Sequence, residues 1–346
     1  MPKIRAFSEL SNIFKEIFNM KQILGIGNAL VDIMTLIDDD QILKVFSLPK
    51  GSMQLVNKEK SDLIKSRTAK CKRTLSSGGS AANTIHGLAM LDAVTGFIGS
   101  IGADETGDFF ERDMKNAGVN TILFRRDSVT GTAVALISPN SERTFATHLG
   151  AAIELGPNDL KKEQFKPFDI LYLEGYLLND KSLVDKACKI AGEKKMEVAL
   201  DLASYNVVEA KIDDFKEIIE KYVDILFANE EEARSFTGLD PEEAIYKIAD
   251  QCKVTVIKVG EKGSIIKSRD GIIKIKSVPV KCKDTTGAGD LYASGFLYGF
   301  ANNLSLDKCG HLGALLAGNV IETVGARINE SKWPEIKECV LSVVNE

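Results

Sequence analysis

A seven-residue segment late in the chain, DTTGAGD, places two carboxylates around a run of small residues. The apolar run that follows, Leu291–Phe300, is typical of a buried helix, so the small residues would form its first turn: Gly287, Ala288 and Gly289. Backbone N–H groups at a helix start lack partners within the helix and can bind phosphate. Asp290 would stand beside that anion, where a carboxylate can accept the proton of an attacking hydroxyl. The segment therefore predicts phosphoryl transfer to an alcohol, although a plain Gly-rich helix cap would have the same composition.

The same residues carry a resemblance to a known family. Asp284–Asp290, followed by Leu-Tyr-Ala-Ser-Gly-Phe, resembles the second signature of the ribokinase (PfkB) family of carbohydrate and nucleoside kinases. The resemblance implies that Asp290 is the catalytic base and that the small-residue turn is the anion hole for the transferred phosphoryl group. It also implies that Thr285 lies on the ATP side of the site and that a monovalent cation such as K⁺ lies near Asp284.

A second candidate segment lies near the N-terminus, where a predicted strand runs into GIGNALVD, Gly25 to Asp32. Its Gly-x-Gly start suits a dinucleotide-binding turn, but Leu30 replaces the third glycine and no acidic residue near position 50 ends a second strand. The segment instead resembles the start of adenosine-kinase-like members of the family. The resemblance implies that the carboxylate of Asp32 accepts hydrogen bonds from two ribose hydroxyls and that Asn28, at the same strand end, also binds the substrate. A loop aspartate that caps the following turn is the alternative.

A glycine turn is predicted where SGGSAAN, Ser77–Asn83, opens a helix. Glycine lets a ligand approach the backbone closely, and an amide side chain both donates and accepts hydrogen bonds. The segment resembles the first signature of the family, G-G-x-x-x-N, which implies contacts with the sugar hydroxyls from Gly78, Gly79 and Asn83. Ile85 departs from the family pattern, which has a small residue there. A helix start without a ligand remains the alternative.

Two further segments are expected on the nucleotide side. Asn229 and Glu232 form a predicted capping box after a strand, and they match a family N-x-x-E motif that organises Mg²⁺ and phosphate through water. Gly260 and Gly263 match a family G-x-x-G that lies near the nucleotide. A simple hairpin turn would use the same two glycines.

Arg143 lies on an alternating, strand-like stretch. In adenosine-kinase-like members an arginine at this place can swing toward the phosphates, so the resemblance implies that Arg143 stabilises charge on the transferred group. A solvated arginine on a strand is equally compatible with the sequence. Asp201 follows a predicted strand at the edge where α/β sheets bind ligands and is a weaker candidate. The three histidines are isolated and indicate no metal cluster: His86, His148 and His311.

Composition excludes several classes of protein. The net charge is −5 with no basic block, which disfavours a nucleic-acid partner. The six cysteines are scattered without a C-x-x-C pair, which argues against a zinc site or a disulfide framework and suits the cytoplasm. No apolar run reaches transmembrane length, so no membrane partner is expected. Residues 1–20 carry one apolar helical stripe and are expected to be an N-terminal extension, either an extra helix packed on the body or a segment upstream of a natural start at Met20.

Strand-like apolar runs alternate with helical patterns from residue 21 to Val259, which predicts a mostly parallel sheet covered on both faces. Beyond it, turn signals predict antiparallel hairpins, and the tail from Leu291 is expected to be helical. Two stretches break this rhythm and would pair as a small antiparallel sheet: 34–56 and 119–148. The resemblance implies that this sheet is a lid over the sugar site. The expected kinase core then comprises 21–33, 57–118 and 149–346.

The sequence therefore predicts a ribokinase-like three-layer α/β/α sandwich with a small β lid. The implied reaction is transfer of the γ-phosphoryl group of ATP, with Mg²⁺, to a primary hydroxyl of a nucleoside, with adenosine preferred. Two alternatives stay open: a sugar or sugar-phosphate kinase of the same family, and a non-catalytic nucleotide- or sugar-binding protein. The sequence does not distinguish a monomer from a homodimer.

Overall fold

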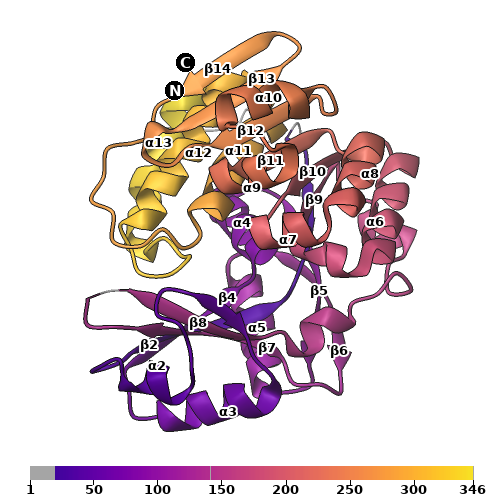
Figure 1. The fold of residues 1–346 in the computed structure, drawn as a ribbon. Helices are drawn as coiled ribbons and strands as arrows, with labels where there is room; N and C mark the ends of the chain where they lie inside the picture. Colours follow the sequence, from indigo (N-terminus) through magenta and orange to yellow (C-terminus); the bar gives the residue numbers. More distant parts are fainter. Residues whose placement is uncertain (1–19, 141, 346) are drawn as a thin grey trace, which may run out of the picture.

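A nine-stranded sheet forms the centre of the molecule (Figure 1), whose computed structural model describes residues 20–140 and 142–345. From edge to edge its strands are β14 (Gly271–Ile275), β13 (Ser264–Ser268), β12 (Val254–Lys258), β11 (Ile225–Asn229), β10 (Glu197–Asp201), β9 (Ile170–Glu174), β1 (Ile23–Ile26), β5 (Thr95–Gly102) and β6 (Asn120–Arg126). The strands from β12 to β6 are parallel, whereas β13 and β14 pair antiparallel. The predicted parallel sheet with terminal hairpins is confirmed.

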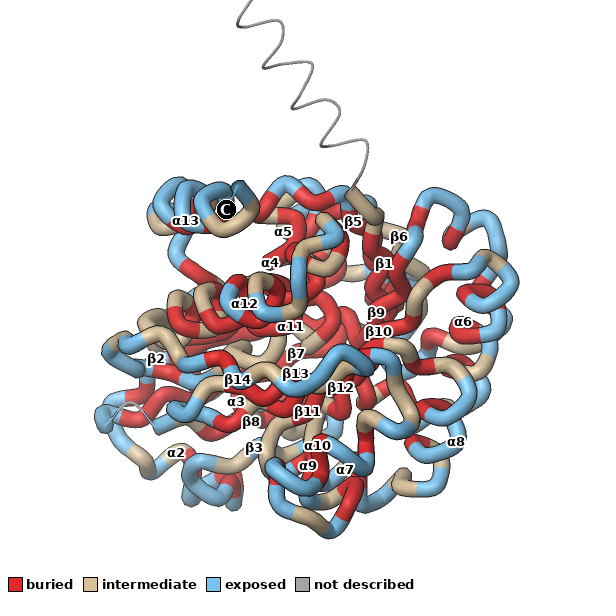
Figure 2. Tube along the Cα trace, turned by 90° about the horizontal axis from the view of Figure 1, so that it is seen from above, coloured by how far each residue is buried: buried red, intermediate tan, exposed pale blue. Residues whose placement is uncertain are grey.

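Helices cover both faces of this sheet because its strands are apolar on both sides. Neighbouring residues of one strand, such as Ile23 and Leu24, pack into different core clusters. One cluster lies under α4 (Ser80–Met90), α5 (Glu105–Asn116), α11 (Ala288–Ala301) and α12 (Leu306–Ile321). The other lies under α6 (Lys181–Glu193), α7 (Tyr205–Ala210), α8 (Ile212–Tyr222), α9 (Glu230–Thr237) and α10 (Pro241–Ala249). The buried core between these layers is visible in Figure 2 and confirms the predicted α/β/α sandwich.

A second, five-stranded sheet lies beside the main body, below it in Figure 1. Its order is β3 (Met53–Leu55), β8 (Arg143–His148), β7 (Gly131–Ile137), β2 (Leu30–Leu36) and β4 (Arg73–Gly78). Two short helices, α2 (Gln41–Val45) and α3 (Lys58–Arg67), accompany this sheet. Its apolar residues, among them Val31 and Ile64 of α3, continue the first core cluster.

The composition of this small sheet differs from the prediction in three ways. Residues 120–126 were expected in the lid, but β6 pairs with β5 and closes an edge of the main sheet. Residues 30–33 and 73–78 were expected in the core, but they belong to β2 and β4, which pair with each other in the small sheet. The small sheet was expected to be antiparallel, but it is mixed, because β2 runs parallel to β7 and β3 runs parallel to β8. Hydrophobic alternation fixes which face of a strand is buried, not which strand is its neighbour.

The packing of α4 against α11 brings their first turns together. A Cβ on Gly87 of α4 would lie 2.5 Å from Oγ of Ser294 in α11, so the two helices approach closely at that glycine. Oγ of Ser294 donates a hydrogen bond to the carbonyl of Thr84 (2.8 Å), and Oγ1 of Thr84 donates to the carbonyl of Asp290 (3.1 Å). These contacts fix Asp290 relative to the Gly78–Gly79 turn that begins α4.

The chain ends in α13 (Trp333–Asn345), which confirms the predicted helical tail. No helix in the described ranges is long and apolar enough to cross a membrane. Of the expected N-terminal extension, residues 1–19 lie outside the described residues.

Candidate active site

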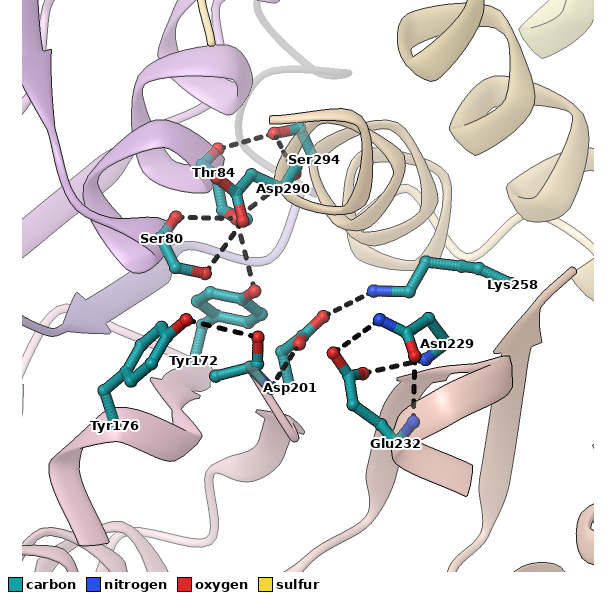
Figure 3. Close-up of polar contacts among 11 residues, drawn as sticks. Ser80, Thr84, Tyr172, Tyr176, Asp201, Asn229, Glu232, Lys258, Asp290 and Ser294 are labelled. Atoms are coloured by element: carbon teal, nitrogen blue, oxygen red, sulfur yellow. Dashed lines mark hydrogen bonds and ion pairs between the residues drawn. The ribbon is translucent and has the colours of Figure 1, made fainter. Parts of the chain in front are cut away.

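Asp290 stands in the first turn of α11, facing the first turn of α4. Its carboxylate accepts hydrogen bonds from Oγ of Ser80 (2.8 Å) and Nδ2 of Asn83 (2.9 Å). Figure 3 shows Ser80 and Asp290 pointing toward each other from their two helices. The side chain remains partly exposed. Two donors therefore hold the carboxylate in one orientation without sealing it in the core.

The surroundings of Asp290 set its proton affinity. Burial raises the pKa of Asp290 to about 6, although the hydrogen bonds from Asn83 and Ser80 oppose the rise. Among nearby charges, Asp201 raises this pKa further and Lys258 lowers it. A carboxylate with this pKa is mostly ionised at pH 7 and is a stronger base than an ordinary aspartate.

The turn before Asp290 is open to an anion. Gly287 has φ 75°, and a Cβ there would lie 2.6 Å from Cβ of Ala326, so both conformation and space require glycine. The N–H of Ala288 was expected in the anion hole. In the structure it instead donates to the carbonyl of Thr285 (3.1 Å). No acceptor within the described ranges takes the N–H groups of Gly287, Gly289 or Asp290. The turn therefore offers three N–H groups, that of Asp290 replacing that of Ala288.

Asp32 lies on β2, against the Gly78–Gly79 turn. A Cβ on Gly78 would come within 2.4 Å of the Asp32 carboxylate, and a Cβ on Gly79, whose φ is 99°, would lie 2.0 Å from the carbonyl oxygen of Asn28. Gly78 is thus required for the Asp32 carboxylate to approach the turn, and Gly79 is required for the backbone of Asn28 to do so. Burial raises the pKa of Asp32 to about 7, while the charge of Arg327 lowers it and that of Asp290 raises it.

Glu174 links these segments and was not among the predicted site residues. Its carboxylate accepts hydrogen bonds from the backbone N–H of Asn28 (2.9 Å), from Nδ2 of Asn28 (2.6 Å) and from the N–H of Ala81 (2.7 Å). It therefore ties the end of β9 to the β1–β2 connection and to α4. Burial raises the pKa of Glu174 to about 7 against these donors.

The expected contacts of Asn28 and Asn83 with sugar hydroxyls are modified by these bonds. One of the two Nδ2 N–H donors of Asn28 is committed to Glu174, and one of those of Asn83 is committed to Asp290. Oδ1 of Asn83 is buried and has no hydrogen-bond partner in the described part of the chain. Asn83 therefore keeps its accepting oxygen and one N–H donor for a further contact.

A charged cluster lies at the ends of β10, β11 and β12, next to Asp290 (Figure 3). Nζ of Lys258 donates to Oδ2 of Asp201 (2.8 Å). Glu232 accepts from the N–H (2.8 Å) and Nδ2 (2.6 Å) of Asn229, whose Oδ1 accepts from the N–H of Glu232 (2.9 Å), so the predicted capping box is confirmed. Burial and the charge of Asp201 raise the pKa of Glu232.

This cluster fits Mg²⁺ only through water. Glu232 is 3% exposed and both its oxygens hold Asn229, so it is not free to coordinate an ion directly. The described ranges contain no group of three or more His, Cys, Asp or Glu side chains that could hold a metal. The carboxylates of Asp201, Glu232 and Asp290 nevertheless outnumber the single ammonium of Lys258. Such excess negative charge suits a hydrated Mg²⁺ that arrives with ATP phosphates.

Gly260 and Gly263 form the turn between β12 and β13, with φ values of 54° and 96°. A Cβ on Gly263 would lie 1.9 Å from the carbonyl oxygen of Ile275, so the hairpin alone requires that glycine. At Gly260 the nearest atom would be Oε2 of Glu230 at 3.8 Å, which leaves open surface beside the start of α9.

Arg143 is not beside Asp290 but reaches from β8 to the loop before α11. Its Nη1 forms an ion pair with Asp284, and its Nη2 donates to the carbonyl of Lys283 (3.1 Å). Asp284 also accepts from the N–H groups of Thr286 (2.8 Å) and Gly325 (2.5 Å). The guanidinium already supplies positive charge at this carboxylate, so these residues, as arranged, do not fit the expected K⁺.

Arg327 is a further residue that the sequence did not single out. Its Nη2 donates to the carbonyl (2.5 Å) and Oγ (2.6 Å) of Ser77, directly before the Gly78–Gly79 turn. Burial lowers the pKa of Arg327 to about 10, against the opposing charges of Asp113, Asp32 and Asp290. Arg327 therefore places a positive charge behind the Gly78–Gly79 turn, against which Asp32 lies.

Comparison with known proteins identifies relatives across most of the chain. A family model described as pfkB family carbohydrate kinase matches residues 52–333. A probable sugar kinase from Rhizobium etli CFN 42 has a solved structure with a TM-score of 0.85 and 34% identity, covering 93% of this chain and 99% of that one. The adenosine kinase from Sinorhizobium meliloti gives a TM-score of 0.84 and 32% identity, covering 92% and 99%.

A curated relative carries the name of a different kinase. The 5-dehydro-2-deoxygluconokinase of Geobacillus kaustophilus (strain HTA426) is 31% identical over 265 residues, which cover 71% of this chain and 79% of that protein. The similarities therefore concern the whole fold and not only the segment around Asp290.

Proposed function

This chain belongs to the pfkB family of carbohydrate kinases, and from that premise we propose that it phosphorylates a primary hydroxyl of a nucleoside, with adenosine as the preferred acceptor. It is a sugar or nucleoside kinase, and membership of the family implies that ATP is the phosphoryl donor. The acceptor is the part of this function that needs experiment.

One observation carries the proposed chemistry: an oriented carboxylate adjoins a turn with three open N–H groups. Asp290 takes the proton of the acceptor hydroxyl. The hydroxyl oxygen forms a bond to the γ-phosphorus as the bond from that phosphorus to the bridging oxygen of ADP breaks. The N–H groups of Gly287, Gly289 and Asp290 bind the charge on the transferring group. Asp290 then releases its proton to solvent.

Mg²⁺, held by the ATP phosphates and through water by Glu232, would neutralise phosphate charge. The small sheet, which carries Asp32, acts in this account as a lid that excludes water from the reaction. Asp32 accepts hydrogen bonds from two neighbouring hydroxyls of the acceptor and so presents the primary hydroxyl to Asp290.

An apolar cluster beside Asp32 supports a nucleoside acceptor. Met34, Ala135, Ile137 and Phe145 pack together on the small sheet. Asp32 and Met34 share a face of β2, and β2 pairs in register with β7, so the cluster adjoins the carboxylate. Phe145 is the partly exposed member of this cluster, so a nucleobase would pack on its ring, whereas a free sugar has no comparable apolar surface.

A sugar kinase is the second candidate, and the relatives support it no less than they support a nucleoside kinase. The probable sugar kinase from Rhizobium etli CFN 42 and the 5-dehydro-2-deoxygluconokinase are as similar to this chain as the adenosine kinase is. An acid sugar would need a cation near its carboxylate, and Arg327 is the buried cation next to the Asp32 site.

An acceptor screen decides between these candidates. ADP formation would be measured with adenosine, other nucleosides, ribose, fructose, fructose phosphates and 5-dehydro-2-deoxygluconate. Turnover confined to adenosine supports the proposal, and turnover confined to sugars supports the second candidate. Ligand-induced thermal stabilisation without any turnover would instead indicate a binding protein.

Acceptor binding should weaken in acid because Asp32 must be ionised to accept two hydrogen bonds. With a pKa of about 7, Asp32 gains a proton as the pH falls through that value, so the Kd of the acceptor should rise below it. Replacing Arg327 with Gln removes a charge that lowers this pKa, so the midpoint should move to higher pH. Calorimetric titration of the acceptor from pH 5.5 to 8.5 measures both midpoints.

The exposed Arg269, replaced by Gln, is the matched control and should leave the midpoint in place. A midpoint that is unchanged or lower in Arg327→Gln would contradict the assignment of Asp32.

A further inference from the structure

The ion pair of Lys258 and Asp201 joins the ends of two strands that are not neighbours. Lys258 ends β12 and Asp201 ends β10, with β11 between them. The pair spans 2.8 Å, and the side chains are only 15% and 6% exposed. Asp201 is held in turn by the N–H of Ala203, which donates to its Oδ1 (2.9 Å). The ammonium of Lys258 is thus fixed from one side by an anchored carboxylate.

The other side of this ammonium faces the start of α11. A Cβ placed on Gly289 would lie 3.0 Å from Nζ of Lys258 and 3.9 Å from its Cε. The ammonium is therefore directly beside the turn whose N–H groups are open, one residue before Asp290. The absence of a side chain at Gly289 leaves nothing between the ammonium and the space over that turn.

Lys258 also has hydrogen-bonding capacity to spare. An ammonium has three N–H donors, and within the described ranges Nζ has one hydrogen-bond partner, Asp201. Burial favours the neutral amine, but the charges of Asp201, Glu232 and Asp290 keep the pKa of Lys258 above its ordinary value. The side chain is thus a cation beside the open turn of α11.

A purely structural role for the ion pair of Lys258 and Asp201 would explain fewer of these observations. Burying a lysine and an aspartate costs desolvation free energy that their attraction only partly offsets. If the lysine served only to neutralise Asp201, its place beside the open turn of α11 would have no function. A cation needed at the transferring group accounts both for this position and for the anchoring of Asp201.

We propose that Lys258 is a catalytic residue whose ammonium binds an oxygen of the transferring phosphoryl group, and that Asp201 is a positioning residue that holds it there. This proposal rests on the proposed phosphoryl transfer. The N–H groups at Gly287, Gly289 and Asp290 and the ammonium of Lys258 then bind different oxygens of one group. No bond is made or broken at Lys258, which supplies charge where charge develops.

The test compares three variants with the wild type. Lys258→Met keeps the length of the side chain and removes its charge. The double variant Asp201→Asn with Lys258→Met removes both charges, so that no carboxylate is left buried without its partner. Lys253→Met is the matched control, because Lys253 precedes β12 at its other end and also pairs with an aspartate, Asp224, at 2.8 Å.

Two readouts are needed: the single-turnover transfer rate and the affinity for ADP with aluminium fluoride, which mimics the transferring phosphoryl group. Both Lys258 variants should transfer about 10²–10³-fold more slowly. Their preference for ADP with aluminium fluoride over ADP alone should also weaken by about the same factor, because the backbone N–H groups remain. Lys253→Met should match the wild type in both respects.

Recovery of the wild-type rate in the double variant would show that Lys258 only neutralises Asp201 and would overturn the proposal. So would an unchanged preference for ADP with aluminium fluoride. A wild-type protein that phosphorylates no acceptor would contradict the proposed function instead, and the affinity comparison would still decide the role of Lys258.

Discussion

Replacing Asp290 with asparagine is expected to lower the phosphoryl-transfer rate by about 10²–10⁴-fold, the usual effect of losing a positioned base. Asparagine has almost the same shape and can still accept a hydrogen bond from Ser80 or Asn83, so the turn before it should persist. It cannot take the proton of the acceptor hydroxyl. ATP binding should therefore be retained, which calorimetry can establish, while single-turnover transfer of the γ-phosphoryl group slows.

Asp307 offers a matched control for this variant. It lies in the first turn of α12, as Asp290 lies in the first turn of α11. Asp307→Asn should leave the transfer rate unchanged. A rate for Asp290→Asn within a few-fold of the wild type would mean that the proton leaves by another route, and Asp290 would then serve only to orient the start of α4.

Replacing Asp32 with alanine should raise the KM of the acceptor by about 10²–10⁴-fold, because each hydrogen bond to a charged group contributes about 1.5–3 kcal/mol and two would be lost. The rate at saturating acceptor should change much less, since Asp290 and its turn are unaltered. Initial rates over a range of acceptor concentrations separate these two effects.

The exposed Asp38, just beyond β2, provides the control, and Asp38→Ala should leave KM unchanged. If Asp32→Ala binds the acceptor as well as the wild type does, the two hydroxyls must be held elsewhere. If it lowers the rate at saturation without changing KM, Asp32 acts on the reacting group rather than on the acceptor.

The sequence predicted well those features that depend on residues close together in the chain. The capping box of Asn229 and Glu232 and the start of α11 after Gly287 were both identified from such short segments. The rhythm of apolar runs predicted the parallel sheet, because helix and strand periodicities differ. The proximity of Asp290 to the turn follows from the same local order.

Features that depend on distant segments were missed. Nothing local indicates that β4 joins the small sheet or that β6 joins the large one. Glu174, Lys258 and Arg327 are single residues without a motif, and each acts on a partner far along the chain. Glu174 and Lys258 end predicted strands, where α/β sheets bind ligands, so this position was the one signal that could have identified them.

The pairing of Arg143 with Asp284 shows the same limit. The resemblance placed one residue near the phosphates and the other near a monovalent cation, each considered alone. In the structure the two meet, so the small sheet is tied directly to the loop that precedes the anion-binding turn. The sequence alone does not show that Arg143 and Asp284 form an ion pair, because the two residues meet only in the folded structure.

Phosphorus NMR of the reaction of ATP with the accepted compound shows directly whether Asp290 serves phosphoryl transfer to an alcohol. A phosphate-ester signal should grow in step with ADP in the wild type and should be absent over the same period in Asp290→Asn. ADP accompanied only by inorganic phosphate, or an ester signal that grows equally fast in the variant, would contradict this role of Asp290.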